Sequence, residues 1–216
     1  MRSMFVQSFA PLRHIFGFPV LEMDWNGALA FFEGHLATSR QRLAVSFFDE
    51  GAALRQLVDP AYRNSLSHRI LLPAAGAPLR AWECLTRKGS APTHFRADQF
   101  VPAFLTFLAE GRRVALVGDE ASGIGRLREE LSIHAPWHEI VAIAASEIAE
   151  YRNDVFDVIL VQASNPAEEQ RIETQLSSLH TGLIMMTGTK LAGFVAERPA
   201  FRVSAATAPL ETSAAA

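Results

Sequence analysis

The sequence predicts an α/β protein with a Rossmann-like, mostly parallel sheet that carries helices on both faces. Short apolar runs alternate along the chain with longer segments whose apolar residues recur at helical spacing, a pattern that interleaves strands with helices. Two runs, residues 114–117 and 158–161, are apolar at every position, which is typical of central parallel strands buried on both faces. We therefore expect five or six strands, with these two adjacent or nearby in one sheet.

Five elements are predicted in the first half of the chain. Residues 42–48 (RLAVSFF) and 69–73 (RILLP) are short β-rich runs that predict strands. Helices are predicted at residues 24–37, 49–59 and 98–111. The last of these helices places Phe100, Phe104, Phe107 and Leu108 on one face, so that face is expected to be buried.

The second half of the chain alternates more regularly. Residues 112–118 (RRVALVG) predict a strand that ends in glycine, and residues 121–136 predict the helix that follows it. Further strands are predicted at residues 138–145, 156–163 and 181–188. A last helix is predicted at residues 165–179, because Asn165 is a suitable N-cap and Pro166 suits the first turn.

Composition narrows the class of protein. The net charge of −3 comes from 20 basic and 23 acidic residues spread along the chain, so no basic patch recommends a nucleic acid as partner. No apolar stretch approaches the ~20 residues of a membrane span, and the single cysteine, Cys84, suits a reducing compartment. We expect a cytoplasmic protein with one domain over residues 1–203 and a disordered tail over 204–216.

Two glycines suggest a phosphate site. Gly118 and Gly123 lie between a predicted strand and helix, where the missing β-carbons allow a phosphate to approach backbone N–H groups and the positive end of the helix. The spacing is not G-x-G-x-x-G, and no lysine follows as a P-loop requires. The alternative is that both glycines serve only the turn.

Polar residues that follow other predicted strands are further candidates. Asn165 and Glu169 come after the most apolar strand, at the sheet edge where open α/β folds bind ligands. Asp49 and Asp98 each open a predicted helix after a strand or loop. All four residue types also stabilise helix N-termini without any ligand. The histidines show neither an HExxH motif nor paired CxxC motifs beside them, so no metal site is expected.

In order and spacing, several segments resemble the bacterial WecG/TagA/CpsF glycosyltransferase family. These segments are FPVLEMDWNGALAFFEGHL, VDPAYRNSLSHRILLPAAGAPL, VALVGDEASGIGRLREELSIHAPW, FDVILVQASNPAEEQRI and LIMMTGTKLAGFVAERPAF. The resemblance covers about residues 18–199. It implies transfer of a sugar from a UDP-sugar to a lipid-linked acceptor in surface or exopolysaccharide synthesis, with no other cofactor. It also implies a location at the inner membrane face and leaves a homo-oligomer open.

The sequence departs from this family at polar positions. The family's proposed general base, the aspartate of an Asp-Gly turn, corresponds to Ala75, and a second family aspartate corresponds to Ala192. The family's Thr-x-Asn pair corresponds to residues 46–48, where only Ser46 offers a hydroxyl. The glutamine of its Pro-Lys-Gln-Glu stretch is Glu168, while Pro166 and Glu169 remain. The family's C-terminal appendage is expected to be truncated after Arg202.

Three hypotheses follow from these departures. The chain is a divergent transferase whose base has moved to Asp49 or Asp98, with Gly118, Gly123, Asn165 and Glu169 as nucleotide contacts. Alternatively, it is a non-catalytic relative that regulates or scaffolds polysaccharide synthesis. The third hypothesis is an unrelated nucleotide-binding module.

Overall fold

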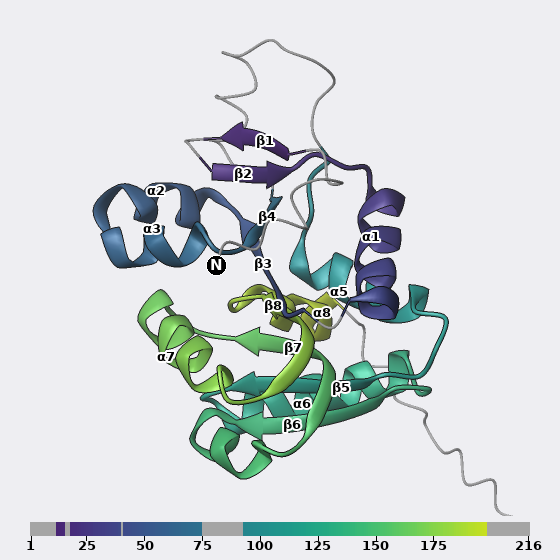
Figure 1. Cartoon of the computed structure of the whole chain (residues 1–216). Helices are drawn as coiled ribbons and strands as arrows, with labels where there is room; N and C mark the ends of the chain where they lie inside the picture. The colour runs from purple at the N-terminus through teal and green to yellow at the C-terminus, as the bar shows by residue number, and fades with distance from the viewer. Residues whose placement is uncertain (1–11, 16–17, 40, 75–92, 198–216) are drawn as a thin grey trace, which may run out of the picture.

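An eight-stranded sheet runs through the computed structural model, which describes residues 12–15, 18–39, 41–74 and 93–197 (Figure 1). Seven of the strands are parallel to one another, and β1 at one edge is antiparallel to β2. In spatial order the strands are β1 (Leu12–Ile15), β2 (Phe18–Leu21), β4 (Ile70–Pro73), β3 (Leu43–Phe48), β8 (His180–Met186), β7 (Val155–Gln162), β5 (Arg113–Gly118) and β6 (Glu139–Ala144). The predicted Rossmann-like α/β class is confirmed.

The two continuous apolar runs form β5 and β7, which are neighbours in the sheet. Val114 pairs with Val158 and Val117 with Val161. Both strands have a parallel partner on either side, because β5 also pairs with β6 and β7 also pairs with β8. The prediction that these runs are adjacent central strands is therefore confirmed.

The described residues contain more elements than the sequence pattern predicted. The expected five or six strands become eight, because the short hairpin of β1 and β2 adds an edge; β2 coincides with the opening strand that the family resemblance implied. A helix over Pro60–Leu66, α3, was also missed. Asp59 explains it: this residue ends the preceding helix, and its carboxylate accepts a hydrogen bond from the Tyr62 N–H at the start of α3.

Helices cover both faces of the sheet. They are α1 (Trp25–Thr38), α2 (Glu50–Val58), α3, α5 (Ala97–Phe107), α6 (Ala121–His134), α7 (Pro166–Leu176) and α8 (Gly193–Glu197), with short 3-10 helices η1 (Ala145–Tyr151) and η2 (Lys190–Ala192). Buried residues of α1, α5 and α6 form one core cluster with one face of the sheet. On the other face, η1 and α7 pack over β5 to β8, while α2 and α3 pack over β2 to β4. Figure 1 shows α2, α3 and α7 on one side of the sheet and α1 and α5 on the other.

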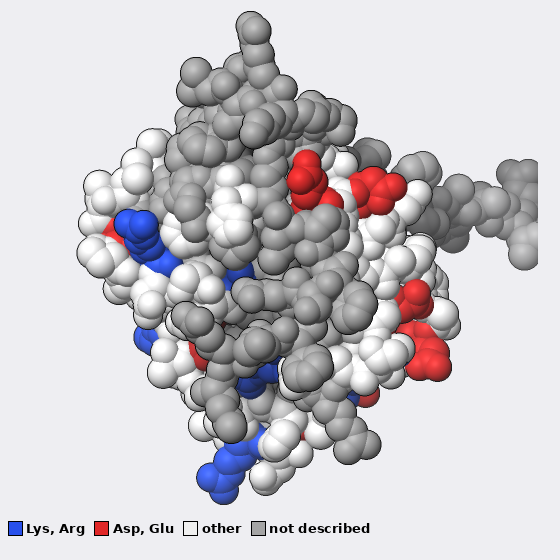
Figure 2. All heavy atoms as spheres, turned by 45° about the horizontal axis from the view of Figure 1, so that its top comes forward, with Lys and Arg blue, Asp and Glu red and all other residues white. Residues whose placement is uncertain are grey.

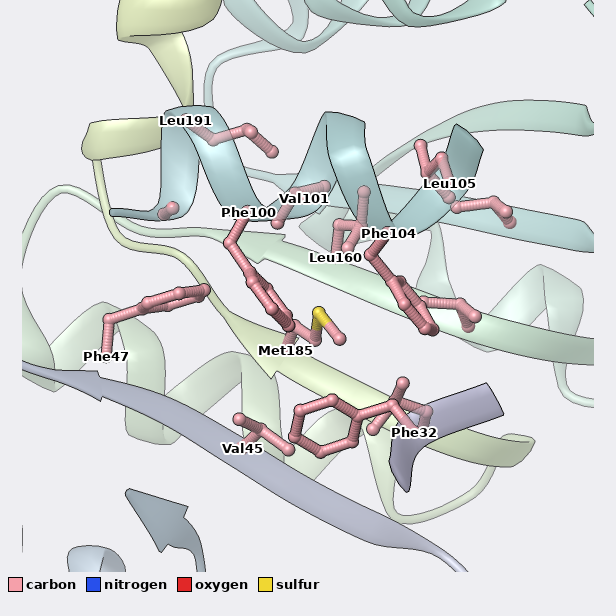
Figure 3. Packing of buried hydrophobic residues seen from close by; sticks show 14 of the residues in the cluster. Phe32, Val45, Phe47, Phe100, Val101, Phe104, Leu105, Leu160, Met185 and Leu191 are labelled. Carbon is pink, nitrogen blue, oxygen red and sulfur yellow. The ribbon is translucent and has the colours of Figure 1, made fainter. Parts of the chain in front are cut away.

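Phe100 on α5 is central to the larger core cluster (Figure 3). It is fully buried, and its ring lies near five other aromatic rings. These are Trp25, Phe32, Phe47, Phe95 and Phe104, with centroid distances of 5.2 to 6.3 Å. Phe100, Phe104 and Leu108 of the predicted face are thus part of the core, whereas Phe107 is 40% exposed, so the prediction was wrong for that residue. Through Phe47 the core reaches the carboxyl end of β3.

None of the helices in the described ranges is long and apolar enough to cross a bilayer.

Candidate functional site

A cavity of about 720 Å³ opens at the carboxyl ends of β3, β8 and β7. The loop after β3 leads to α2 on one face of the sheet, whereas the loop after β8 leads to η2 and α8 on the opposite face. The loops after these two neighbouring strands therefore diverge. Such a switch point is where open α/β sheets bind ligands, because the connecting loops diverge there and leave a crevice.

Asp49 and Lys190 lie side by side in one wall of this cavity and form an ion pair. Asp49 caps α2, since its Oδ1 accepts a hydrogen bond of 2.8 Å from the Ala52 N–H. Its Oδ2 forms an ion pair with the Lys190 ammonium, which comes from η2 after β8. Partial burial lowers the pKa of Lys190 from its usual value. The wall thus combines a lysine with the N-terminal end of α2.

The turn between β7 and α7 forms a second wall, and its polar groups are engaged locally. Asn165 accepts a hydrogen bond of 3.0 Å from the Glu168 N–H, and the Glu168 carboxylate accepts one of 2.6 Å from the Ser164 N–H. This arrangement satisfies N–H groups that the first helical turn would otherwise leave unpaired. Asn165 therefore caps the N-terminus of α7, a role that needs no ligand.

The loop after β8 is held against β7. Both the N–H and the hydroxyl of Thr187 donate to the Val161 carbonyl, at 2.9 and 2.8 Å. Gly188 then adopts φ +55°, a left-handed conformation that favours glycine. This turn directs the chain back toward η2 and so places Lys190 at the cavity.

Beneath these walls, Ser46, Tyr62 and Glu169 bring polar groups to the cavity. Glu169 forms an ion pair with Arg69, whose guanidinium also donates to the Ser46 hydroxyl at 2.9 Å. Burial, followed by the charge of Glu169, raises the pKa of Tyr62 to about 12, so its hydroxyl stays protonated at neutral pH. Sequence reasoning missed Arg69, because it was interpreted only as the first residue of a strand.

A smaller cavity of about 420 Å³ adjoins the first and shares Phe47, Thr189 and Lys190 with it. Asp98 lies on its lining, largely buried. Arg96 binds this carboxylate through two nitrogens, with 3.1 Å from Nε to Oδ1 and a second contact from Nη2 to Oδ2. Asp98 is therefore held in a two-point ion pair.

The predicted site residues are thus divided among three places. Asp49, Asn165 and Glu169 line the larger cavity, and Asp98 lines the smaller one. Gly118 and Gly123 are in neither lining. A Cβ built on Gly118 would lie 2.9 Å from the Gln162 carbonyl oxygen and 2.9 Å from Ile124 Cγ2. Close packing between strand and helix thus accounts for this glycine.

The resemblance to the WecG/TagA/CpsF family also drew attention to Ser46, Ala75, Ala192 and Arg202. Ser46 lies in the larger cavity, and Ala192 lies exposed in η2. Ala75 and Arg202, and the predicted tail over residues 204–216, lie outside the described residues. Among the residues that the structure describes, no group of three or more His, Cys, Asp or Glu side chains could hold a metal ion.

Charged side chains do not gather into a large patch of one sign in the view of Figure 2, as far as the described residues show. No protein-family model matches this chain, and no curated protein matches it.

Proposed function

We propose that the larger cavity binds a UDP-sugar, and that the chain is a divergent relative of the WecG/TagA/CpsF glycosyltransferases. One observation carries the proposal. The switch point of the sheet brings two sets of groups into one cavity. The first set carries positive charge and consists of Lys190 and the N-terminal ends of α2 and α7. The second set can bind hydroxyl groups and consists of Ser46, Tyr62 and Glu169.

The first set of groups suits a diphosphate. Helix N-terminal ends carry a partial positive charge, and a lysine ammonium adds a full charge. In the structure Lys190 pairs with Asp49. A bound diphosphate would compete with Asp49 for Lys190, since phosphate oxygens accept charge-assisted hydrogen bonds from ammonium groups.

The second set of groups suits the hydroxyls of a ribose or a sugar. A carboxylate such as that of Glu169 is a strong acceptor for hydroxyl donors. The Tyr62 and Ser46 hydroxyls both donate and accept. A nucleotide sugar carries both chemical features, because its diphosphate joins two hydroxyl-bearing rings.

The same cavities also support two opposed views of catalysis. A transferase would use Asp49 or Asp98 to take a proton from a lipid-linked acceptor at the inner membrane face, while cationic groups stabilise the departing UDP. However, each of these carboxylates already holds a cation, Lys190 or Arg96. An acceptor hydroxyl would therefore have to share these oxygens with a cation. This favours the second candidate function, a non-catalytic relative that binds UDP-sugars and regulates or scaffolds polysaccharide synthesis.

Isothermal titration calorimetry with UDP, UDP-glucose and UDP-N-acetylglucosamine tests the binding proposal. Lys190→Met is expected to weaken binding about tenfold or more, since a hydrogen bond to a charged group contributes roughly 1.5–3 kcal/mol. Arg152→Gln is the matched control, because Arg152 is exposed and precedes β7 at the opposite edge of the sheet. Equal affinity of the native protein and Lys190→Met would contradict the site.

The nucleobase distinguishes the remaining hypothesis. ADP and GDP are titrated beside UDP under the same conditions. Preference for UDP supports the proposed relationship to UDP-sugar transferases. Equal affinity for all three diphosphates would support an unrelated nucleotide-binding module instead.

A further inference from the structure

The Arg69 guanidinium is buried where the α3 side and the α7 side of one sheet face meet. Its side chain is 0% exposed. The apolar cluster under α2 and α3 lies on one side of it, and the cluster under α7 lies on the other. Arg69 is therefore a charged group inside the protein at the boundary of two apolar cores, directly beside the larger cavity.

Arg69 lies between α3 and β4, and its partners come from two other elements, β3 and α7. From β3, the Ser46 hydroxyl accepts from Nη1. From α7, Glu169 pairs with Nη1, and Glu173 accepts from Nη2 at 2.5 Å and from Nε at 3.3 Å. From α3, the Ser65 hydroxyl donates to Glu173 at 3.5 Å. The planar guanidinium thus fixes α7 against β3 and the start of β4.

Stability alone is a weak reason for such a group. A buried ion pair is costly to desolvate, and apolar residues of similar size often stabilise a protein equally well. Burial on its own would lower the pKa of Arg69, but hydrogen bonding to Glu173 and the charges of Glu169 and Glu173 raise it. Arg69 therefore stays cationic wherever the protein is folded, and it holds two carboxylates.

Only one of those carboxylates lines the cavity. Glu169 and Ser46 are in the lining, whereas Glu173 and Arg69 are not. Arg69 donates a hydrogen bond to Oε1 of Glu169, so Oε2 is the oxygen that can accept a hydrogen bond from a ligand hydroxyl. The same nitrogen, Nη1 of Arg69, also donates a hydrogen bond to the Ser46 hydroxyl. It thereby orients a second group of the cavity that can bind a ligand hydroxyl.

We propose that Arg69 is a positioning residue that orients Glu169 and Ser46 to bind vicinal hydroxyls of the ligand. This inference rests on the proposed function and adds to it a specificity device. The hydroxyls belong either to the ribose or to the transferred sugar. The pair of groups that Arg69 holds selects ligands with hydroxyls over ligands without them.

Two ligand comparisons test this proposal and identify the ring. UDP against 2′,3′-dideoxy-UDP reports recognition of the ribose, and UDP-glucose against UDP reports recognition of the sugar. The native protein is expected to prefer the hydroxyl-bearing ligand in one comparison about tenfold, the magnitude for a hydrogen bond to a carboxylate. In Arg69→Met this preference is expected to fall to about one, while affinity for the less preferred ligand of that pair stays within about threefold of the native value.

Three further variants keep the test interpretable. Arg69→Lys retains the buried cation should Arg69→Met fail to fold, and it is expected to restore the preference only in part because an ammonium lacks the planar fork. Glu169→Gln is expected to lose the preference as Arg69→Met does. Glu173→Gln is the control, since it changes a partner of Arg69 outside the cavity lining, and it is expected to keep the preference.

A preference ratio separates positioning from general damage, because loss of fold weakens both ligands of a pair together. A native preference that persists in Arg69→Lys and Glu169→Gln would overturn the positioning role and leave UDP binding intact. A native protein that binds UDP without any hydroxyl preference would do the same. Absence of UDP binding by the native protein would overturn both the proposed function and this inference.

Discussion

Several polar side chains at the carboxyl ends of the strands accept hydrogen bonds from nearby backbone N–H groups, whether or not a ligand is bound. Asp49, Asn165 and Glu168 all accept hydrogen bonds from N–H groups at the start of a helix or just before it. These bonds occupy oxygens that a ligand could otherwise use. A ligand is therefore expected to meet Lys190 and Glu169 more directly than it meets the capping residues.

Tyr62 provides a test of how buried the cavity floor is. The sequence has two tyrosines, so Tyr151→Phe leaves Tyr62 as the only one. In that variant the phenol is expected to ionise at about pH 12, because burial and the charge of Glu169 oppose a second negative charge. Ultraviolet titration of phenolate absorbance checks this value.

The linkage of this titration to stability has a definite sign. A phenol whose pKa is raised in the folded state binds its proton more tightly there than in the unfolded chain. The free energy of unfolding should therefore decline from about pH 10 to about pH 12, and Tyr62→Phe should remove that part of the decline. A midpoint near pH 10 in the Tyr151→Phe variant would show that Tyr62 is solvated.

Gly118 and Gly125 form a matched pair for testing the role of the glycines. Gly118→Ala is expected to lower the free energy of unfolding by about 1–3 kcal/mol, because its Cβ would meet the Gln162 carbonyl and Ile124 at 2.9 Å. Gly125→Ala meets nothing within 4 Å inside α6, so it is expected to stabilise by about 0.5–1 kcal/mol. Urea denaturation measures both changes.

UDP affinity completes the glycine test. If Gly118 only packs strand against helix, Gly118→Ala leaves UDP affinity unchanged at temperatures where the variant is folded. Weaker binding without loss of stability would instead return Gly118 to the ligand site.

At the scale of elements, predictability follows the strength of the local pattern. The strands β5 and β7 contain the continuous apolar runs 114–117 and 158–161, and α7 has Asn165 and Pro166 at its start, so these were predicted to within a few residues. The strand β1 has only four residues with mixed polarity, and α3 follows α2 through the shared cap Asp59. Short elements of this kind form because of their tertiary neighbours, which a local pattern does not contain.

The hairpin of β1 and β2 is expected to be the least protected part of the sheet. Among the described residues, β1 pairs only with β2, and β2 pairs with β4 at one position, Val20 with Leu71. In contrast, β7 is paired on both sides. Hydrogen exchange read by mass spectrometry should show residues 12–21 exchanging at least about 100-fold faster than residues 155–162, because local opening costs less at a weakly paired edge. Equal protection would mean that the hairpin and the central sheet open together.

For the whole molecule, the site was predictable in part. The sequence indicated Asp49, Asn165 and Glu169 because each follows a predicted strand, and parallel strands end at one edge of the sheet. It did not indicate Lys190, Tyr62 or Arg69. Their roles depend on which strands are neighbours. The partners of Arg69 on α7 follow it by about a hundred residues, so no local pattern links them.

Catalysis is also a property of the whole molecule. With ordinary UDP-sugars and a polyprenyl-diphosphate-sugar acceptor, the native chain is expected to show little or no transfer. In the proposed relationship to the WecG/TagA/CpsF family, Ala75 would stand where those enzymes have their general base, and loss of a positioned base typically costs ~100- to 10,000-fold in rate. A radiolabelled-sugar transfer assay on the native protein and on Ala75→Asp measures this.

The outcomes of the transfer assay separate the two views of catalysis. Partial recovery in Ala75→Asp with a silent native chain would support the non-catalytic relative. Robust native turnover that Asp98→Asn or Asp49→Asn abolishes would show a transferase whose base has moved.

The central position of β8 has a consequence for synthesis on the ribosome. It is the last strand of the described residues in chain order, yet it lies between β3 and β7, pairing Leu43 with Leu183 and Val158 with Leu183. A nascent chain emerges from its N-terminus, so β3 and β7 each present an unpaired strand edge until residues 180–186 have been made. Unpaired edges template association with other chains. Translation that stalls before His180 should therefore yield an aggregation-prone intermediate, and a chaperone that shields those two edges would act just before β8 inserts.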